Sequence, residues 1–249
     1  MNALKGRILV IGATSGVGQA FCDRALDLGF RLTLAARTID GAIRVARDLE
    51  IRKQVASIPV LMCDVADASS HAAFVESAMK HDDLVGCFVA CGVMHEQEAC
   101  EAEWALAAET IACNYTGTVS LVARLAPVLA EAEGGFISCL TSVAGDRGRQ
   151  SNYLYGSTKA GLNAWLEGLQ NSFFAAGLLV QTIKLGPVDT PMNTGVERAP
   201  FMISPERAAR AIHDAIRRRE QVVYVPRKWA AIMAVIRMLP RWLFNRLKL

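Results

Sequence analysis

Short apolar runs alternate with longer segments in which apolar residues recur every three or four positions. Apolar runs bounded by turn residues predict buried strands, and the amphipathic segments predict helices that cover them. Strands are expected at residues 7–11, 31–36, 57–62, 84–90, 135–140, 179–185 and 221–225. Helices are expected at about 16–29, 40–53, 68–81, 101–130, 152–176 and 205–219.

Regular strand–helix alternation indicates a parallel, doubly wound sheet of about seven strands, the Rossmann-type α/β architecture. A chain of 249 residues is long enough to form one such domain with a sizeable core. We therefore assign residues 1–226 to a single α/β domain and residues 227–249 to an amphipathic helical tail. Residues 191–203 show no periodicity and are a candidate lid over a substrate.

Cysteine usage predicts a reducing compartment. The seven cysteines show no CxxC or zinc-type spacing, and most fall in expected strands or on apolar helix faces, as buried thiols do. The first strand starts within a few residues of the N-terminus without a basic and apolar leader, and no apolar run is long enough to cross a bilayer. We expect a cytoplasmic protein without a metal site.

The first expected strand is followed by GATSGVG and a helix. Gly12, Gly16 and Gly18 would allow a tight turn, so that backbone N–H groups and the helix N-terminus can approach a pyrophosphate. The spacing is GxxxGxG and differs from the GxGxxG of the common dinucleotide fingerprint, so a purely structural turn is the alternative. The expected cofactor contacts here are Gly12, Thr14, Ser15, Gly16, Val17 and Gly18.

Arg37 follows the second expected strand, and no carboxylate lies between residues 31 and 39. Dinucleotide-binding folds place an acidic residue near this point for the ribose of NAD, or an arginine for the 2′-phosphate of NADP. Arg37 therefore favours NADP(H) over NAD(H), the alternative being an ordinary solvated arginine.

Candidate chemistry centres on residues 142–159. Tyr155 and Lys159 are four residues apart, so on a helix they lie one above the other and the ammonium would stabilise an ionised phenol. Ser142 ends an apolar run, and strand ends are where ligands meet open α/β sheets. The serine hydroxyl could bind a substrate oxygen while the phenol exchanges its proton.

Further candidate contacts lie at other strand ends. Asp64 could accept from an adenine amino group or cap a helix, and Gly92 lies in a small-residue turn that would run along the cofactor. Asn114, inside an expected helix, indicates a kink or a bound water, with an exposed asparagine as the alternative. After the sixth strand, Pro187, the Val188 backbone and the Thr190 hydroxyl are candidates to hold a nicotinamide carboxamide.

Together these segments resemble the classical short-chain dehydrogenases/reductases, and the resemblance covers about residues 7–225. It rests on GATSGVG, Arg37, Asp64-Val65, NYTG, TSVAG, Tyr155-x-x-x-Lys159 and GPVDT. The resemblance implies a catalytic tetrad of Asn114, Ser142, Tyr155 and Lys159. Tyr155 would act as acid/base, Ser142 would orient the carbonyl or alcohol, Lys159 would bind the nicotinamide ribose, and Asn114 would hold a relay water. It also implies cofactor contacts at Asp64 and Val65, and a homodimer or homotetramer.

Three positions depart from the usual pattern of this family. Ile11 replaces a threonine, Cys91 and its neighbours lack the asparagines of an NNAG turn, and Leu185-Gly186 replaces Pro-Gly. None of the three is a member of the implied tetrad.

The C-terminal end is basic and apolar: from Arg198 onward there are twelve Lys or Arg and three Asp or Glu. Apolar residues of 227–249 fall on one helical face, with Trp229 and Trp242 as candidate interfacial anchors. We expect this tail to lie peripherally on the inner face of a membrane. The alternative is that it packs on the body or on a second subunit and closes the pocket.

The tail is also weakly similar to that of reductases of polyprenyl-phosphate-linked 2-keto sugars and of 3-ketosphinganine. We therefore expect an NADP(H)-dependent reductase that converts a ketone, lipidic or lipid-linked, to a secondary alcohol. The alternatives are a 3-oxoacyl-thioester reductase, a soluble sugar or polyol dehydrogenase, and a non-catalytic nucleotide sensor or scaffold. No recognised nucleic-acid-binding module is present, and we expect no nucleic-acid partner.

Overall fold

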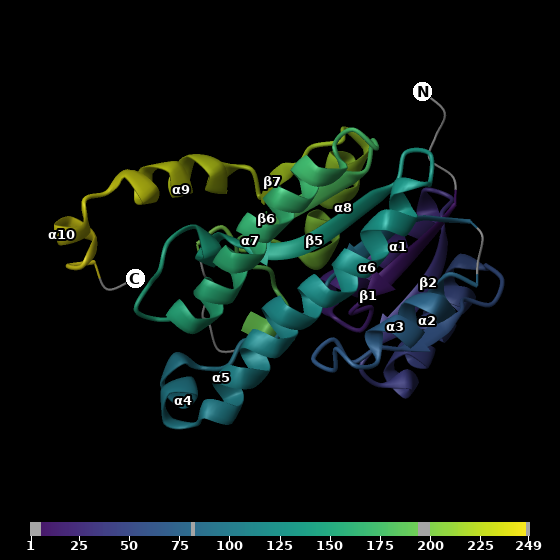
Figure 1. Cartoon of the computed structure of the whole chain (residues 1–249), viewed down its shortest axis with the longest axis horizontal. Helices are drawn as coiled ribbons and strands as arrows, with labels where there is room; N and C mark the ends of the chain where they lie inside the picture. The colour runs from purple at the N-terminus through teal and green to yellow at the C-terminus, as the bar shows by residue number, and fades with distance from the viewer. Residues whose placement is uncertain (1–5, 81–82, 194–199, 248–249) are drawn as a thin grey trace.

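The computed structural model describes residues 6–80, 83–193 and 200–247. Its centre is a sheet of seven strands in the order β3-β2-β1-β4-β5-β6-β7, and every neighbouring pair is parallel. The strands are β1 (Arg7–Ile11), β2 (Arg31–Ala36), β3 (Val60–Met62), β4 (Leu84–Val89), β5 (Phe136–Ser142), β6 (Leu179–Leu185) and β7 (Val222–Val225). The expected doubly wound architecture is confirmed (Figure 1).

The strand order reverses between β1 and β4. From β1 the chain proceeds outward to β2 and β3, then returns to β4 on the other side of β1 and continues to β7. The loops after β1 and β4 therefore separate at their carboxyl ends and leave a crevice, which is where open α/β sheets bind ligands.

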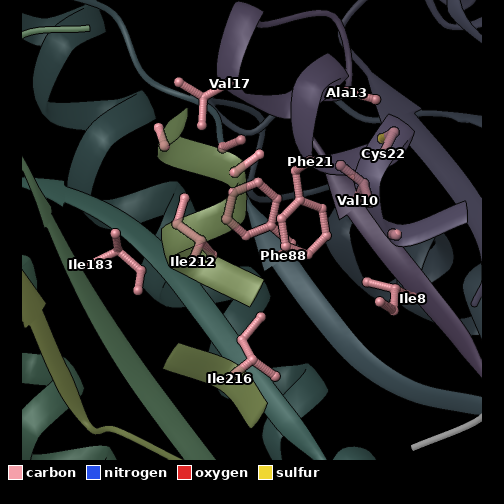
Figure 2. Close-up of a cluster of buried hydrophobic side chains, with 14 of the residues drawn as sticks. Ile8, Val10, Ala13, Val17, Phe21, Cys22, Phe88, Ile183, Ile212 and Ile216 are labelled. Carbon is pink, nitrogen blue, oxygen red and sulfur yellow. The ribbon is translucent and has the colours of Figure 1, made fainter. Parts of the chain in front are cut away.

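One face of the sheet is covered by α1 (Gly16–Asp27), α2 (Ile39–Lys53) and α8 (Pro205–Arg217). Side chains alternate along β1, so Ile8 and Val10 point to this face. Figure 2 shows Phe21 of α1 between the sheet and α8, with its ring stacked on that of Phe88 at a centroid distance of 3.8 Å. Ile212 of α8 packs into the same cluster, so α1 is held by contacts with both the sheet and α8.

The opposite face is covered by α3 (His71–Ala78), α6 (Thr118–Ala130) and α7 (Tyr153–Phe173). Leu9 and Ile11 of β1 point here and pack with fully buried residues of α6 such as Leu121 and Leu125. Leu162 and Leu166 of α7 join this cluster. Because both faces are covered, the strands are apolar on both sides, as expected for a parallel sheet.

The long helix expected at residues 101–130 is wrong in detail. It divides into α4 (Gln97–Ala102), α5 (Trp104–Ile111), a π-helical segment (Ala112–Gly117) and α6. Glu103 has extended backbone angles and separates α4 from α5. The π segment contains Asn114, whose side chain is fully buried, so the helix is irregular at this residue and the exposed alternative is excluded.

Other boundaries differ less. Strand β3 begins at Val60 and not at residue 57, because Pro59 cannot donate a ladder hydrogen bond; its carbonyl still accepts one from Leu34 at 2.9 Å. Short 3₁₀ turns follow β5 (Val143–Asp146) and β6 (Pro191–Asn193). Residues 194–199 of the expected lid lie outside the described residues.

The C-terminal tail forms α9 (Lys228–Met238) and α10 (Arg241–Phe244), which extend from the β7 edge on the opposite side of the molecule from α2 and α3 (Figure 1). The inner side of α9 packs on the body: Trp229 and Met233 are buried and contact Val143. The first part of the tail therefore packs as the alternative interpretation expected. Among the described residues, no helix combines the length and apolar character needed to cross a bilayer.

Candidate active site

A cavity of about 710 Å³ opens at the carboxyl ends of β1, β4, β5 and β6. This volume is typical of pockets for small ligands. Ser142, Tyr155 and Lys159 line it together with many of the expected cofactor contacts. The latter are Thr14, Ser15, Gly16, Val17, Gly92, Pro187, Val188 and Thr190. The expected residues that do not line it are Gly12, Gly18, Arg37, Asp64, Val65 and Asn114.

The glycine turn after β1 fits a dinucleotide phosphate group. Gly12 has φ +84°, and a Cβ built on it would lie 2.6 Å from the backbone nitrogen of Cys91. Gly18 is equally confined, because a Cβ there would collide with the carbonyl of Gly12. Ser15 caps α1 by accepting a hydrogen bond from the Gly18 N–H at 3.0 Å. The capped N-terminus of α1 faces the cavity, and such termini bind phosphate.

The acid/base candidates come from β5 and α7. Lys159 is only 3% exposed, and its Nζ donates to the Leu140 carbonyl at 3.3 Å and lies 5.7 Å from the centre of the Tyr155 ring. Ser142 is the last residue of β5, and its Oγ accepts from the Ala144 N–H at 3.0 Å. That bond uses an oxygen lone pair and leaves the hydroxyl hydrogen to donate. These three side chains therefore meet at one place.

Asn114 lies behind the cavity wall. Its Oδ1 accepts from the Val93 N–H and its Nδ2 donates to the Val93 carbonyl, both at 2.8 Å. A Cβ on Gly92 would lie 3.2 Å from Asn114 Oδ1 and 3.4 Å from Lys159 Nζ. The amide thus fixes the turn after β4 beside the lysine, a contact that the sequence did not indicate.

Arg37 follows β2 at the rim of the crevice and is 68% exposed. Its Nη1 lies 3.5 Å from a carboxylate oxygen of Glu109, whose other oxygen lies 2.9 Å from His95 Nε2. An ion pair this long and exposed contributes little stability, so the guanidinium can exchange it for another anion.

Asp64 and Val65 form the turn after β3. Asp64 accepts from the Ala66 N–H at 3.0 Å, so it stabilises this turn, whereas Ser70 is the N-cap position of α3. Val65 is buried, and its carbonyl lies so close to Gly117 that a side chain on Gly117 could not fit.

Thr190, in the loop after β6, packs on Gly16. A Cβ built on Gly16 would lie 2.8 Å from the methyl carbon of Thr190. The loops after β1 and β6 thus converge.

Cysteine and metal chemistry find no support in this cavity. All seven cysteines lie within the described ranges and are free. Burial raises the pKa of the Cys91 thiol to about 12, so this lining residue is a neutral thiol near pH 7. Within residues 6–80, 83–193 and 200–247, no group of three His, Cys, Asp or Glu side chains could hold a metal ion.

Sequence reasoning missed several lining residues, among them Arg149 and Trp229. Arg149 lies in the loop between β5 and α7, and its place between Ser142 and Tyr155 was the signal available. Trp229 was expected as a membrane anchor, but it is 8% exposed and its indole packs on Gly186 at the cavity wall. The expectation of a membrane anchor is wrong for Trp229, because the apolar side of α9 packs on the body of the protein and buries this side chain. Trp242 is 63% exposed.

Known protein families and curated proteins include relatives of this chain. The sequence profile described as short chain dehydrogenase matches residues 6–200. An uncharacterized oxidoreductase of Mycobacterium tuberculosis is 30% identical over 241 residues, which cover 96% of each chain.

Two solved structures share the fold. A short-chain dehydrogenase from Sphingobium yanoikuyae in complex with NADPH has a TM-score of 0.80 at 21% identity, covering 95% of this chain and 97% of its own. A short chain dehydrogenase/reductase from Burkholderia phymatum in complex with NAD has a TM-score of 0.82 at 20% identity, covering 94% of each chain.

Proposed function

Because the chain belongs to the short chain dehydrogenase family, we propose that it is an NADP(H)-dependent oxidoreductase that reduces a ketone to a secondary alcohol. The observation that carries this proposal is the meeting of Ser142, Tyr155 and Lys159 in the same cavity as the capped glycine turn. A protein that only sensed nucleotides would need the turn but not the acid/base group.

The reaction adds a hydride and a proton across the carbonyl, and NADPH supplies the hydride when bound. In our proposal, Ser142 donates a hydrogen bond to the carbonyl oxygen and Tyr155 transfers its phenolic proton to it. The ammonium of Lys159, 5.7 Å from the Tyr155 ring, stabilises the phenolate that remains. The same groups run in reverse for alcohol oxidation.

The preference for NADP(H) depends on Arg37. Its exposed guanidinium follows β2, and the Sphingobium relative contains NADPH, although the Burkholderia relative contains NAD. We expect NADPH to bind more tightly than NADH in a fluorescence titration, and Arg37→Ala to reduce NADPH affinity to that of NADH. Arg31→Ala is the matched control, because Arg31 is 64% exposed at the opposite end of β2. Equal affinities in the wild type would refute the role of Arg37.

Turnover is tested separately with Tyr155→Phe. The variant keeps the ring but lacks the proton, so it should bind NADPH as the wild type does and lose nearly all ketone reduction. Retained reduction would exclude Tyr155 as the acid. A wild type that binds NADPH but reduces no ketone would favour the sensor or scaffold.

We also propose that the ketone is lipidic or lipid-linked and that the tail meets a membrane. The supporting observation is the outer side of the tail, where Val235, Met238 and Trp242 are more than 60% exposed near basic residues. Apolar and basic side chains on one surface suit an anionic bilayer. Flotation with anionic vesicles at low salt tests this, and protein that stays unbound would exclude it. A 3-oxoacyl thioester remains the alternative substrate.

A further inference from the structure

The cavity has two chemically different ends. The glycine turn, Gly92 and the loop after β6 line the end that suits a cofactor. The far end, beyond Tyr155, is lined by residues 94–97 after β4, by Arg149 and Asn152 before α7, and by Trp229 of α9. This far end is where the part of a substrate beyond its carbonyl would lie, and its chemistry constrains that part.

Arg149 is a partly buried cation, and no ion pair to it is found among the described residues. Among the described residues, its Nε has no hydrogen-bond partner, and its Nη2 makes only a weak contact of 3.5 Å with the sulfur of Met233. Burial lowers the pKa of the guanidinium, with the charge of Asp146 opposing that shift. Asp146 is itself engaged by Lys184 at 2.6 Å and by the Tyr224 hydroxyl at 2.7 Å. The fold therefore partly buries Arg149 and leaves its Nε without a hydrogen-bond partner among the described residues.

Two more unsatisfied polar atoms belong to the same end. Within the part of the chain that the structure describes, neither Trp229 Nε1 nor Asn152 Oδ1 has a hydrogen-bond partner, and both are buried. Most buried polar atoms in proteins are hydrogen-bonded, and leaving one unsatisfied costs about 1–3 kcal/mol. These three atoms belong to residues that line one cavity, so a ligand bound there can provide their partners. Two of them are donors, and Arg149 is charged.

The electrostatic balance favours an anion. Among the described lining residues, Glu96 is the only carboxylate, and it is exposed at the cavity rim. Lys159, which is 3% exposed, adds a second cation to the same cavity. A buried guanidinium pairs best with a carboxylate or phosphate, to which it can donate two parallel hydrogen bonds.

We propose that Arg149 and Trp229 form a subsite for a carboxylate or phosphate group of the ketone substrate, with Asn152 accepting from a neighbouring hydroxyl or amide. This rests on the proposed function, because Tyr155 fixes where the carbonyl lies. Asn152 is the residue before α7 and Tyr155 lies in the first turn of that helix, so the subsite is on the same cavity wall as the acid/base group. The substrate is thus a ketone that also carries an anionic group.

The test measures binding apart from turnover. Hexanoate, hexyl phosphate and neutral hexanamide are titrated calorimetrically into the protein saturated with NADP⁺. We expect one of the two anions to bind at least tenfold more tightly than hexanamide, and the better anion identifies the group. Arg149→Met should abolish this preference, and Trp229→Phe should reduce it while keeping the ring. Arg217→Met, at an exposed arginine of α8, is the matched control and should retain it.

Wild-type protein without an anion preference, or a preference that survives in Arg149→Met, would overturn the subsite. If Arg149→Met does not fold, Arg149→Lys keeps the charge but removes Nε, and a partial loss of preference is then expected. The outcome is independent of the proposed reduction. Ketone reduction without an anion preference would refute only the subsite, whereas an anion preference without any turnover would refute only the reductase.

Discussion

Replacing Asn114 by alanine should destabilise the protein by about 2–4 kcal/mol. The substitution leaves the N–H and the carbonyl of Val93 without the partners that each has at 2.8 Å. An orphaned buried polar group costs about 1–3 kcal/mol. Val93 is partly accessible to solvent, so we take about 1–2 kcal/mol for each of its two groups, which gives the stated total. The small cavity left by the amide adds to the loss.

Urea unfolding followed by circular dichroism measures this loss as a shift of the midpoint at constant slope. Asn114→Asp tests the geometry further, because it keeps the shape and the acceptor but places an oxygen against the Val93 carbonyl. Thr110→Val is the matched control: its buried hydroxyl donates to the Leu106 carbonyl of its own helix at 2.8 Å, and we expect a loss below about 1 kcal/mol.

An Asn114→Ala variant within 1 kcal/mol of the wild type, or an Asn114→Asp variant as stable as the wild type, would refute the clamp on Val93. The measurement also decides how activity data are interpreted. Asn114 is implied in the catalytic tetrad by resemblance, but the structure gives its side chain a backbone-holding contact. Lost activity therefore indicates a catalytic role only in a variant whose unfolding free energy is known.

Two further predictions concern His213 and Arg147. Burial lowers the pKa of His213 from 6.5 to about 4, so on acidification the unfolded chain binds a proton at a higher pH than the folded protein does. The free energy of unfolding should therefore fall by on the order of 3 kcal/mol as the pH drops from about 6.5 toward 4. His213→Gln should flatten this slope in unfolding titrations, and an unchanged slope would contradict it. Arg147→Ala should speed tryptic cleavage of the tail, because Arg147 donates to the carbonyls of Ile236 and Leu239 and stacks on Phe244; cleavage at the wild-type rate would show that these contacts do not hold it.

Much of the fold could be predicted because each strand is a short apolar run and each helix begins at a recognisable signal. The helix expected at about residues 205–219 is an example: the sequence Ser204-Pro205-Glu206 is a common helix start, and the Ser204 hydroxyl accepts from the Arg207 N–H. The break at Glu103 was not predictable, because neither glycine nor proline marks it. Its cause is tertiary, since Gln97 of α4 accepts from the Leu154 N–H of α7 and anchors the short helix there.

The candidate site was predictable where a motif fixes the spacing, as for Tyr155 and Lys159 on one helix face. It was not predictable where distant segments meet. Arg149 looks like any loop arginine until the structure shows that α9 partly covers it at Met233. Trp229 has the composition of a membrane anchor, and only the position of β7 beside β6 brings it onto Gly186.

The acid/base residues and one wall of the cavity belong to different parts of the chain, because α9 supplies that wall. The family profile ends at residue 200, whereas the Trp229 wall of the cavity belongs to the segment that follows. Mutations after that point can reshape what enters the cavity while the acid/base residues stay untouched. Related enzymes could therefore diverge in substrate through their last few dozen residues alone, and an exchange of C-terminal segments between relatives would transfer selectivity as a single inherited unit.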